Sequence, residues 1–253
     1  MPLEIVTVPC RSDNYAFLVH DSGAGQTLLV DAPEAAPIQA ALDARGWTLS
    51  DIWITHHHDD HIDGVAALRN GARVVGAKAD SHRLPDLDLA VSEGDALDFA
   101  GHAAQIFDVS GHTIGHIAFY LADANAVFTA DSLMALGCGR LFEGTPDQMW
   151  ASLSKLAALP ADTIVCSGHE YTAANAKFAL TIEPKNPALQ TRAAAITQAR
   201  AQGVATVPST LSDELATNPF LRAGLQEVKD AIDMSQATDV ACFAEIRKRK
   251  DRF

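Results

Sequence analysis

The sequence has few cysteines and no long apolar run, and each shortage excludes a class of protein. Its four cysteines are scattered over 253 residues and form no CxxC pair, which is typical of reduced thiols in a cytoplasmic protein rather than of a disulfide scaffold. No stretch approaches 18 consecutive apolar residues, so we expect no membrane span. The first residues carry no basic segment followed by a long apolar one, so we expect no signal peptide.

Basic residues are also scarce, because 19 lysines and arginines stand against 32 aspartates and glutamates, giving a net charge of -13. A general nucleic-acid binder presents a basic surface, so this balance counts against that class. The exception is the stretch EIRKRKDRF, which carries five basic residues, Arg247, Lys248, Arg249, Lys250 and Arg252. Charge alone favours a solvated tail here over a local site for an anion.

The rest of the composition is that of a globular protein, with 48% hydrophobic residues and no repeat of fixed period. This length suits one large domain, or a core domain with a smaller appendage. The first part alternates short β-type runs with helical segments, which is typical of layered α/β architecture. Strand signals nearly vanish after about residue 172. We therefore expect an α/β domain over 1–172 and a helical domain over 173–253.

The local patterns predict individual elements. Alternating apolar residues and short apolar runs predict strands over 3–9, 14–20, 27–33, 51–55, 72–77, 97–101, 103–109, 116–123, 126–131 and 163–168. A hairpin turn fits Asp123, Ala124 and Asn125. Helical spacing predicts helices over 36–46, 62–70, 146–160, 172–184, 188–203 and 239–250. One further short strand is expected over 205–208.

The stretch ITHHHDDHIDG at 54–64 carries four histidines and three aspartates within eight positions. Histidine is the commonest metal-binding side chain, and carboxylates complement it for zinc, iron or manganese. A metal-sequestering tract or an expression tag would lie at a terminus, whereas this stretch is internal and follows a predicted buried strand. Because residues i and i+2 of an extended segment point to the same side, His56 and His58 can share one ion. Asp60 and His61, at the start of the next helix, can serve a second ion.

Neither pair completes a coordination sphere, since a zinc site needs about four ligands. Further donors stand at the ends of predicted strands, with His112 and His116 in VSGHTIGH, Asp131 in FTADS and His169 in VCSGHEYT. Taken singly, each of them is an ordinary loop residue. Together with the cluster, they indicate two metal ions that share a carboxylate.

This order of motifs resembles the metallo-β-lactamase superfamily: T-H-x-H-x-D-H, then GHT, then a strand ending in Asp, then a strand ending in GH. Further segments are similar to the glyoxalase II family, the hydroxyacylglutathione hydrolases. They are SDNYAFLVHD near the start, GCGRLFEGT at 137–145, GHEYTAAN at 168–175, EPKNPAL at 183–189, TVPSTLSDELATNPFLR at 206–222 and the terminal IRKRKDRF. The resemblance covers essentially the whole chain. It implies an αββα sandwich, with metals at one edge of the two sheets, and a C-terminal helical domain.

The resemblance also implies a role for each residue of the metal site. One ion would be held by His56, His58 and His112, the other by Asp60, His61 and His169, with Asp131 as a bridge. The catalytic carboxylates would be Asp60 and Asp131, which hold the ions whose hydroxide is the nucleophile. His57 and Asp59 fill variable positions of the motif. His116 supports the ligands from behind or has a structural role.

A substrate site is implied by the same resemblance, made of Arg140, Phe142, Tyr171, Arg247 and Lys250. The basic end of the chain is then interpreted as a clamp for the carboxylates of glutathione, since arginine suits bidentate capture of a carboxylate. Arg140 stands where a lysine is usual, which keeps the charge but changes the geometry. Phe142 replaces a common tyrosine, which removes one substrate hydrogen bond. Asp63 departs from a Gly-Gly-like pair; we expect it in the first turn of a helix, with contact to the surroundings of the second metal as the alternative.

The implied reaction is hydrolysis of S-(2-hydroxyacyl)glutathione, typically S-D-lactoylglutathione, to glutathione and a 2-hydroxy acid, the second step of methylglyoxal detoxification. A hydroxide held by the metals would attack the thioester carbonyl. The expected metal is zinc, and iron and manganese remain open because all the ligands are N and O donors. We expect a monomer that acts on a small molecule in the cytoplasm. The alternatives are another hydrolase of this fold (a lactonase or a phosphodiesterase), a one-iron sulfur dioxygenase, and a non-catalytic metal-binding protein.

Overall fold

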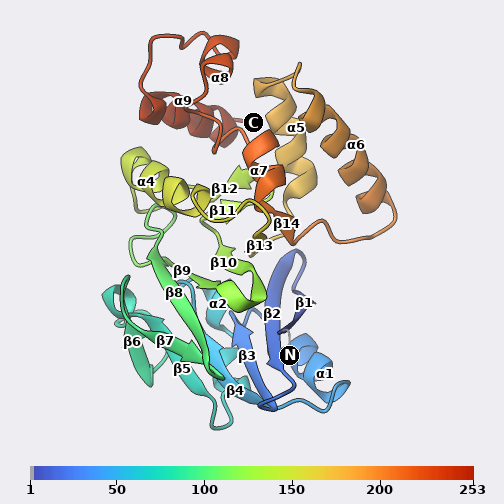
Figure 1. Cartoon of the computed structure of the whole chain (residues 1–253), viewed down its shortest axis with the longest axis vertical. Helices are drawn as coiled ribbons and strands as arrows, with labels where there is room; N and C mark the ends of the chain where they lie inside the picture. The colour runs from blue at the N-terminus through green and yellow to red at the C-terminus, as the bar shows by residue number, and fades with distance from the viewer. Residues whose placement is uncertain (1–2) are drawn as a thin grey trace.

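Two sheets packed face to face form the centre of the computed structural model, which describes residues 3–253 (Figure 1). The first sheet has the order β1-β2-β3-β4-β5-β6, from β1 (Glu4–Cys10), β2 (Asn14–Asp21), β3 (Gln26–Val30), β4 (Leu49–Trp53), β5 (Arg73–Ala77) and β6 (Leu89–Val91). The second has the order β14-β13-β10-β9-β8-β7, from β7 (Leu97–Phe99), β8 (His102–Asp108), β9 (Ile117–Leu121), β10 (Ala126–Ala130), β13 (Ile164–Ser167) and β14 (Ser209–Thr210). Strands β3 to β6 pair in parallel, as do β10 and β13, and the remaining pairs are antiparallel.

Large aromatic side chains fill the space between the two sheets. Trp53 of β4 lies with its ring centroid 5.0 Å from that of Phe119 and 6.4 Å from that of Phe99, and both phenylalanines come from the second sheet. Phe17 of β2 meets Phe128 of β10 edge to face at 5.8 Å. Because successive side chains of a strand point to opposite faces of a sheet, every second side chain of each strand points into this core.

Helices cover the outer face of each sheet. The helices are α1 (Ala35–Asp43), α2 (Asp59–Ile62), α3 (Val65–Leu68), α4 (Pro146–Ala157), α5 (Thr172–Ile182), α6 (Pro187–Ala201), α7 (Leu211–Thr217), α8 (Gln226–Ala231) and α9 (Asp239–Asp251). Ile38 of α1 and Val65 of α3 share a cluster with residues of the first sheet. Met149 and Leu153 of α4 share a second cluster with β9, β10 and β13. The expected αββα sandwich is therefore confirmed.

The C-terminal helices lie over the end of the sandwich that carries β10 and β13 (Figure 1). Phe178, Phe220 and Phe243 belong to the same apolar cluster as Val127 and Val165 of the second sheet, while α5 and α6 also share a smaller cluster with Leu136. The short strand β14 joins the C-terminal region to that sheet by pairing with β13. The boundary near residue 172 stays a prediction. None of the helices within residues 3–253 is both long and apolar enough to span a bilayer.

Three local predictions need correction. The strand expected over 205–208 is wrong, because the pairing residues are Ser209–Thr210. The helix expected over 62–70 is two short helices, α2 and α3, that meet at Gly64. The amide of Gly64 bonds the carbonyl of Ala32 at 2.8 Å, and a Cβ there would lie 3.0 Å from that oxygen, so the chain bends to touch the first sheet. The helix expected over 36–46 ends at Asp43, and Gly46 takes the positive φ of +66° that the following turn requires.

Candidate metal centre

The histidines and aspartates of the predicted site meet where strands of both sheets end. Residues 55–58 follow β4 and lead into α2, and the segment 109–116 joins β8 to β9. Asp131 follows β10, and His169 comes two residues after β13. The structure therefore places donors from four separate segments at one edge of the sandwich, beside the C-terminal helices.

Three histidines form the first group. The ring atoms His56 Nε2 and His112 Nε2 lie 3.1 and 3.0 Å from His58 Nδ1. Facing ring nitrogens at this distance either share a proton or bind a common cation. All three lie in one set whose ligand atoms are within 4.8 Å of one another.

The second group comprises Asp60, His61 and His169. The carboxylate oxygen Asp60 Oδ2 lies 3.4 Å from His169 Nε2 and 4.0 Å from His61 Nε2. Two imidazoles and one carboxylate are an ordinary donor set for zinc, iron or manganese.

Asp131 stands between the two groups and turns one oxygen to each. Its Oδ2 lies 3.4 Å from His112 Nε2, while its Oδ1 lies 3.3 Å from His169 Nε2 and 3.6 Å from His61 Nε2. Both Asp131 Oδ1 and His61 Nε2 are buried, and neither has a hydrogen-bond partner among residues 3–253. Buried polar atoms are seldom left unpaired, so this pair fits a cation between them. The donor set thus fits a divalent metal site.

Hydrogen bonds from behind orient the ligand rings. His61 Nδ1 pairs with Asp31 Oδ2 at 2.8 Å, and His169 Nδ1 pairs with Asp13 Oδ1 at 2.9 Å. Each bond places the ring proton on Nδ1, which leaves Nε2 free to act as a ligand. Asp31 is held in turn, because it accepts from the amide and the hydroxyl of Thr55, both at 2.8 Å.

Sequence reasoning missed these orienting aspartates. Asp31 follows β3 directly, so the rule that donors gather at strand ends could have found it. Asp13 lies in the turn between β1 and β2, within the segment SDNYAFLVHD that carried part of the resemblance. Neither stands near the histidine cluster in the sequence, and no spacing rule connects them to it.

The site has strongly shifted pKa values. Burial, together with four neighbouring histidines, holds the pKa of His56 well below its usual value. Burial works against ionisation of Asp131, but His61, His169 and His112 outweigh it and hold the pKa of this carboxyl far below its ordinary range. Burial likewise opposes the charge on His169, yet the neighbouring carboxylates, Asp131 first and then Asp13 and Asp60, outweigh it and raise the pKa of the imidazole to about 9. The carboxylate at the centre is therefore ionised, as a metal ligand has to be.

His57, Asp59 and His116, the motif residues that were not predicted as ligands, lie in different surroundings. His57 points away from the ligand groups, as expected, and its Nδ1 lies 2.8 Å from Oδ2 of the buried Asp80. Asp59 is exposed at the start of α2. His116 is buried and stacks on His56 with the ring centroids 4.5 Å apart, so it supports a candidate ligand from behind.

Asp63 does not occupy the place predicted for it. It is not in the first turn of a helix but follows the last residue of α2, at the C-cap. Its carboxylate pairs with the Arg11 guanidinium instead. The prediction was wrong because it assumed one long helix, whereas the chain ends α2 here and begins α3 after Gly64.

The predicted substrate residues line a hollow of about 380 Å³ that opens onto the metal centre. It contains His58, Asp60, His112, Asp131 and His169 together with Arg140, Phe142, Tyr171, Arg247 and Lys250. Tyr171 stacks on His169 with ring centroids 4.6 Å apart, and Phe142 lies 60% exposed at the rim.

The cations of this hollow come from two segments. Arg247 of α9 is buried; its Nη1 donates to the carbonyl of Cys138 at 2.9 Å and its Nη2 to Asp251 at 2.9 Å. Its Nε has no hydrogen-bond partner in the part of the chain that the structure describes. Arg140 reaches the same Asp251 at 3.4 Å. Burial and the charge of Arg247 lower the pKa of Lys250. The hollow is lined by three basic side chains, Arg140, Arg247 and Lys250, against two carboxylates, Asp60 and Asp131, so its lining is positive overall, which suits a ligand that carries carboxylates.

A second hollow of about 490 Å³ meets the metal centre from another side. It shares His58, Asp60, His169 and Tyr171 with the first, and adds Arg11, Ser12, Asp13, Asn14 and Asp59. The candidate metal ligands thus lie between a positive hollow and a polar, more acidic one.

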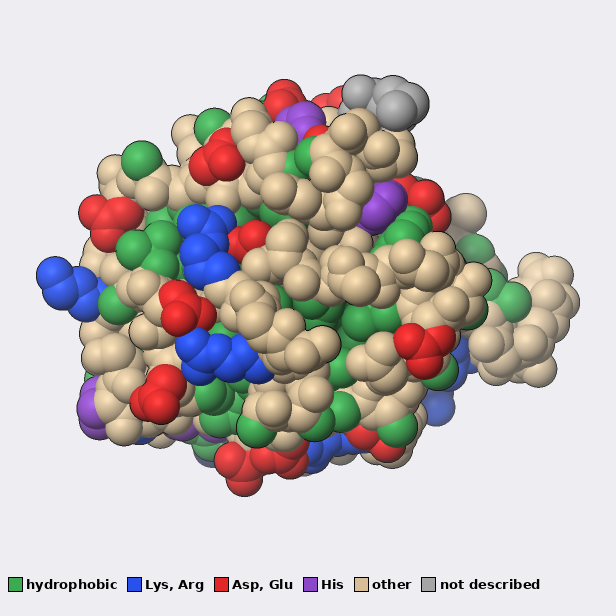
Figure 2. Space-filling view, turned by 90° about the horizontal axis from the view of Figure 1, so that it is seen from below, with side chains coloured by type: hydrophobic (Ala, Val, Ile, Leu, Met, Phe, Trp, Pro, Cys, Tyr) green, Lys and Arg blue, Asp and Glu red, His purple; other side chains and the backbone are tan. Residues whose placement is uncertain are grey.

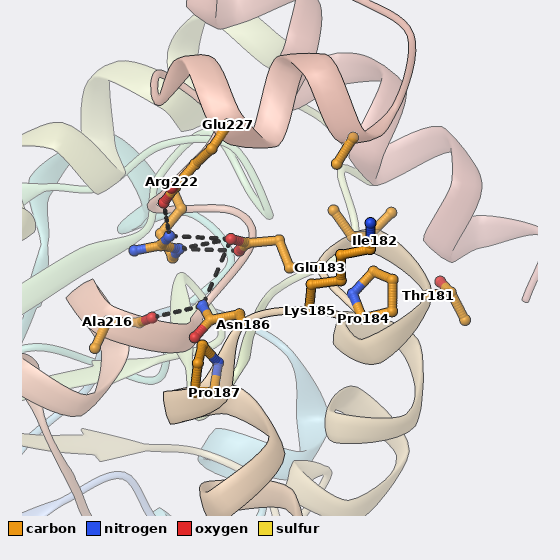
Figure 3. Close-up of a pocket in the computed structure, with 11 residues that line it drawn as sticks. Thr181, Ile182, Glu183, Pro184, Lys185, Asn186, Pro187, Ala216, Arg222 and Glu227 are labelled. Atoms are coloured by element: carbon orange, nitrogen blue, oxygen red, sulfur yellow. Dashed lines mark hydrogen bonds and ion pairs between the residues drawn. The ribbon is translucent and has the colours of Figure 1, made fainter.

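A third hollow, of about 620 Å³, lies away from the histidines among α5, α6, α7 and α8 (Figure 3). Its arginine is paired with two carboxylates, since Arg222 Nε lies 2.9 Å from Glu183 Oε2 and its Nη2 contacts Glu227, and Asn186 donates to the carbonyl of Ala216 at 3.0 Å. The metal centre, with its unpaired buried atoms, is the better candidate for the functional site.

Comparisons with known proteins place the chain in a family. Residues 11–169 match the family model described as metallo-beta-lactamase superfamily. A B3 metallo-beta-lactamase, BLEG-1, has a similar crystal structure, with a TM-score of 0.67 at 20% identity over 86% of this chain and 99% of that one. The fold and the metal motif together make this chain a member of the metallo-β-lactamase superfamily, and a hydrolase.

The remaining third of the chain identifies the family within this superfamily. Residues 170–253 match the model for the hydroxyacylglutathione hydrolase C-terminus. The hydroxyacylglutathione hydrolase of Ruegeria pomeroyi is 68% identical over all of both chains, and that of Cereibacter sphaeroides (strain ATCC 17025) is 62% identical over all of both. The chain therefore belongs to the hydroxyacylglutathione hydrolase family, glyoxalase II.

Proposed function

We propose that this protein hydrolyses S-(2-hydroxyacyl)glutathione, with S-D-lactoylglutathione as its typical substrate. Water is added across the carbon–sulfur bond, so the thioester gives a 2-hydroxy acid and glutathione, and no oxidant or reductant is needed. The observation that carries the proposal is the unpaired, buried Asp131 Oδ1 between two groups of histidines, directly beside a positive hollow. The relatives named as hydroxyacylglutathione hydrolases support the choice of substrate.

The proposal includes two metal ions. His56, His58 and His112 would hold one, Asp60, His61 and His169 the other, and Asp131, which faces both groups, would contribute to both sites. Zinc is the first choice, and the same donors also suit iron and manganese. Iron has support from the crystal structure of TTHA1623 in a di-iron-bound form, which has a TM-score of 0.55 at 28% identity over 67% of this chain and 91% of that chain. When bound, the ions supply a water of lowered pKa as the nucleophile and a Lewis acid at the thioester carbonyl.

The protein's own residues bind and orient the substrate. Arg247 and Lys250 of α9 are placed to attract the glutathione carboxylates, and Arg140 adds a third charge at the rim. Tyr171 offers a hydroxyl next to His169. The leaving thiolate has an intrinsic pKa near ~8.5, so it departs without a separate proton donor.

The basic residues that would bind glutathione lie in the first hollow, so the acyl group of the substrate is directed toward the second hollow. The carbonyl has to reach the metal centre, and the acyl chain then continues past His58 and Asp60 toward Ser12 and Asn14. The substitution Ser12→Trp, at an exposed position, tests this path. It should slow turnover of a long-chain acyl thioester much more than that of the lactoyl thioester, and equal slowing of both would contradict it.

We propose further that the protein acts as a cytoplasmic monomer on small molecules rather than on nucleic acid. One chain contains every proposed ligand, and four free, buried thiols suit a reducing compartment. The net charge is -13, and on the end of the molecule away from the C-terminal helices acidic and basic side chains are mixed (Figure 2). Light scattering tests the monomer, and a filter-binding assay tests for nucleic acid.

One assay compares the proposal with its alternatives. The purified protein is offered lactoylglutathione, a lactone and a phosphodiester, with metal analysis of the same sample. We expect thioester hydrolysis that disappears on strong chelation and returns with added metal. Hydrolysis that survives chelation would exclude the metal mechanism. Turnover of the lactone or the phosphodiester alone would favour the other hydrolases of the fold.

A further inference from the structure

Arg83 connects the metal-binding segments to the segment that carries two proposed substrate residues. It lies just after the short helix η1 (Lys78–Asp80), in a part of the chain to which no role has been given so far. Its guanidinium contacts two carboxylates: Nε bonds Asp80 Oδ1, and the two terminal nitrogens bond the two oxygens of Glu143. Such a bidentate pair fixes orientation as well as distance.

Asp80 carries this contact to the first metal group. It is fully buried, and its second oxygen accepts from His57 Nδ1 at 2.8 Å, so it holds the residue between the candidate ligands His56 and His58. A Cβ on Gly115 would lie 2.4 Å from the Cβ of Asp80, which shows that the 111–116 segment packs directly against it. The Asp80 carboxylate is therefore fixed between the two segments that supply the first metal group.

Glu143 connects Arg83 to the segment that carries Arg140 and Phe142. Its Oε2 accepts from the amide of Ile114 at 2.8 Å. The pairing with Arg83 lowers the pKa of Glu143 to about 2, so the carboxylate is charged at all working pH values. We call residues 139–144 the rim segment, because it carries Arg140 and Phe142.

The rim segment lies directly on the 111–116 segment. The amide of Phe142 donates to the carbonyl of His112 at 3.2 Å, and the amide of Gly144 donates to that of Gly111 at 3.0 Å. The Phe142 ring centroid lies 5.2 Å from that of His112 and 5.7 Å from that of His58. A shift of this segment would therefore change the entrance to the metal centre.

We propose that Arg83 is a positioning residue for the substrate: it holds Glu143, and thereby the rim segment, in place over the first metal group. The inference rests on the proposed thioester hydrolysis and adds to it. Arg83 touches no proposed ligand, so its removal should disturb the entrance more than the chemistry. Without Arg83, the carboxylates of Asp80 and Glu143 lose their shared counter-charge, and Glu143 has reason to turn to solvent.

The test compares Arg83→Met with a matched control, Arg69→Met. Arg69 has nearly the same side-chain exposure, 35% against 32%, and it also pairs with a carboxylate, since its Nη2 contacts both oxygens of Asp88, but this pair lies away from the hollow. We expect Arg83→Met to raise the KM for the thioester about fivefold to tenfold, with kcat lowered less than twofold and bound metal unchanged. Arg83→Lys should restore part of the loss, and Arg69→Met should behave as the wild type.

A second measurement does not depend on activity. Hydrogen exchange should show faster exchange at the amides of Phe142 and Gly144 in Arg83→Met but not in Arg69→Met. Inactivity of the wild-type protein would refute the proposed function, and the exchange data would still decide the role of Arg83. An unchanged KM with unchanged exchange, or equal effects in the two variants, would overturn the positioning role.

Discussion

The metal centre and the positive hollow beside it share residues, yet they are held in different ways. The histidines of the centre are largely buried. Hydrogen bonds to Asp31 and Asp13 fix the ring orientations of His61 and His169. The hollow depends on long side chains at its rim, where Arg140 is 57% and Phe142 60% exposed. The side chains of the centre are buried and held by neighbouring residues, so we expect a change there to abolish function. A change in the hollow should instead alter affinity by degrees.

The largest effect should come from Asp131→Asn. This change keeps the size of the side chain but removes the charge that faces both groups of histidines. We expect a loss of at least about a thousandfold in kcat/KM, or about 4 kcal/mol of transition-state stabilisation, together with loss of bound metal. Thioester turnover and metal analysis measure the two effects. Asp123→Asn, which changes an exposed partner of His102, is the control, and comparable activity in the two variants would show that the centre does not need this carboxylate.

Asp31→Asn tests whether the orienting bonds make the centre rigid. The amide is a weaker acceptor for His61 Nδ1 and cannot balance its charge, so the ring loses its fixed tautomer. We expect metal affinity to fall about 10–100-fold, as is usual for partners behind a ligand. Competition with a chelator measures the affinity, and circular dichroism checks that the fold is retained. Unchanged affinity in a folded variant would refute the orienting role.

Substitutions in the positive hollow should mainly lower the affinity for the substrate. Combining Arg247→Met with Lys250→Met removes two positive charges, so the KM for the thioester should rise about 10–100-fold, while kcat changes less than threefold. The control combines Lys248→Met with Arg249→Met on the same helix, where Arg249 bonds Glu245 rather than the hollow. Because Arg247 also bonds the Cys138 carbonyl, Lys250→Met alone serves as a milder second variant. A KM equal to that of the control would refute the proposed binding of glutathione carboxylates by Arg247 and Lys250.

The smallest effect should come from Phe142→Tyr, which introduces the hydroxyl common in the family. One added hydrogen bond contributes about 0.5–1.5 kcal/mol, so we expect the KM to fall about twofold to tenfold with little change in kcat. Steady-state kinetics on lactoylglutathione decide this. An unchanged or higher KM would indicate that the exposed ring acts through packing on His58 and His112.

Much of the fold could be predicted because its strands and long helices are strongly patterned. In α4, for example, Pro146 near the start and the spacing of Met149, Leu153 and Leu156 predict the helix and its buried face, which the structure confirms. The structure adds a capping box of Thr145 and Gln148, which sequence reasoning missed. Short elements were missed, namely β6, β11 (Leu133–Met134), β12 (Gly137–Cys138), β14, α7 and α8. Two or three paired residues carry too little pattern to be found, and their partners decide whether they pair at all.

The sequence by itself determined the class of the site. The spacing of His56, His58, Asp60 and His61 is local, and i, i+2 geometry together with one helical turn predicts that they divide into two groups. Their number and type also define the donor chemistry, since imidazole and carboxylate donors select the same metals wherever they meet.

Only the tertiary structure decided what surrounds these donors. Asp31 and Asp80 lie far from the histidine cluster in the chain, and Arg83 reaches Glu143 across 60 residues, so no local pattern could join them. The place of Asp63 was likewise set by the contact of Gly64 with Ala32, which divides the expected helix in two. The physical reason is the same in each case: these partners are chosen by packing and charge in three dimensions, whereas periodicity carries only short-range information.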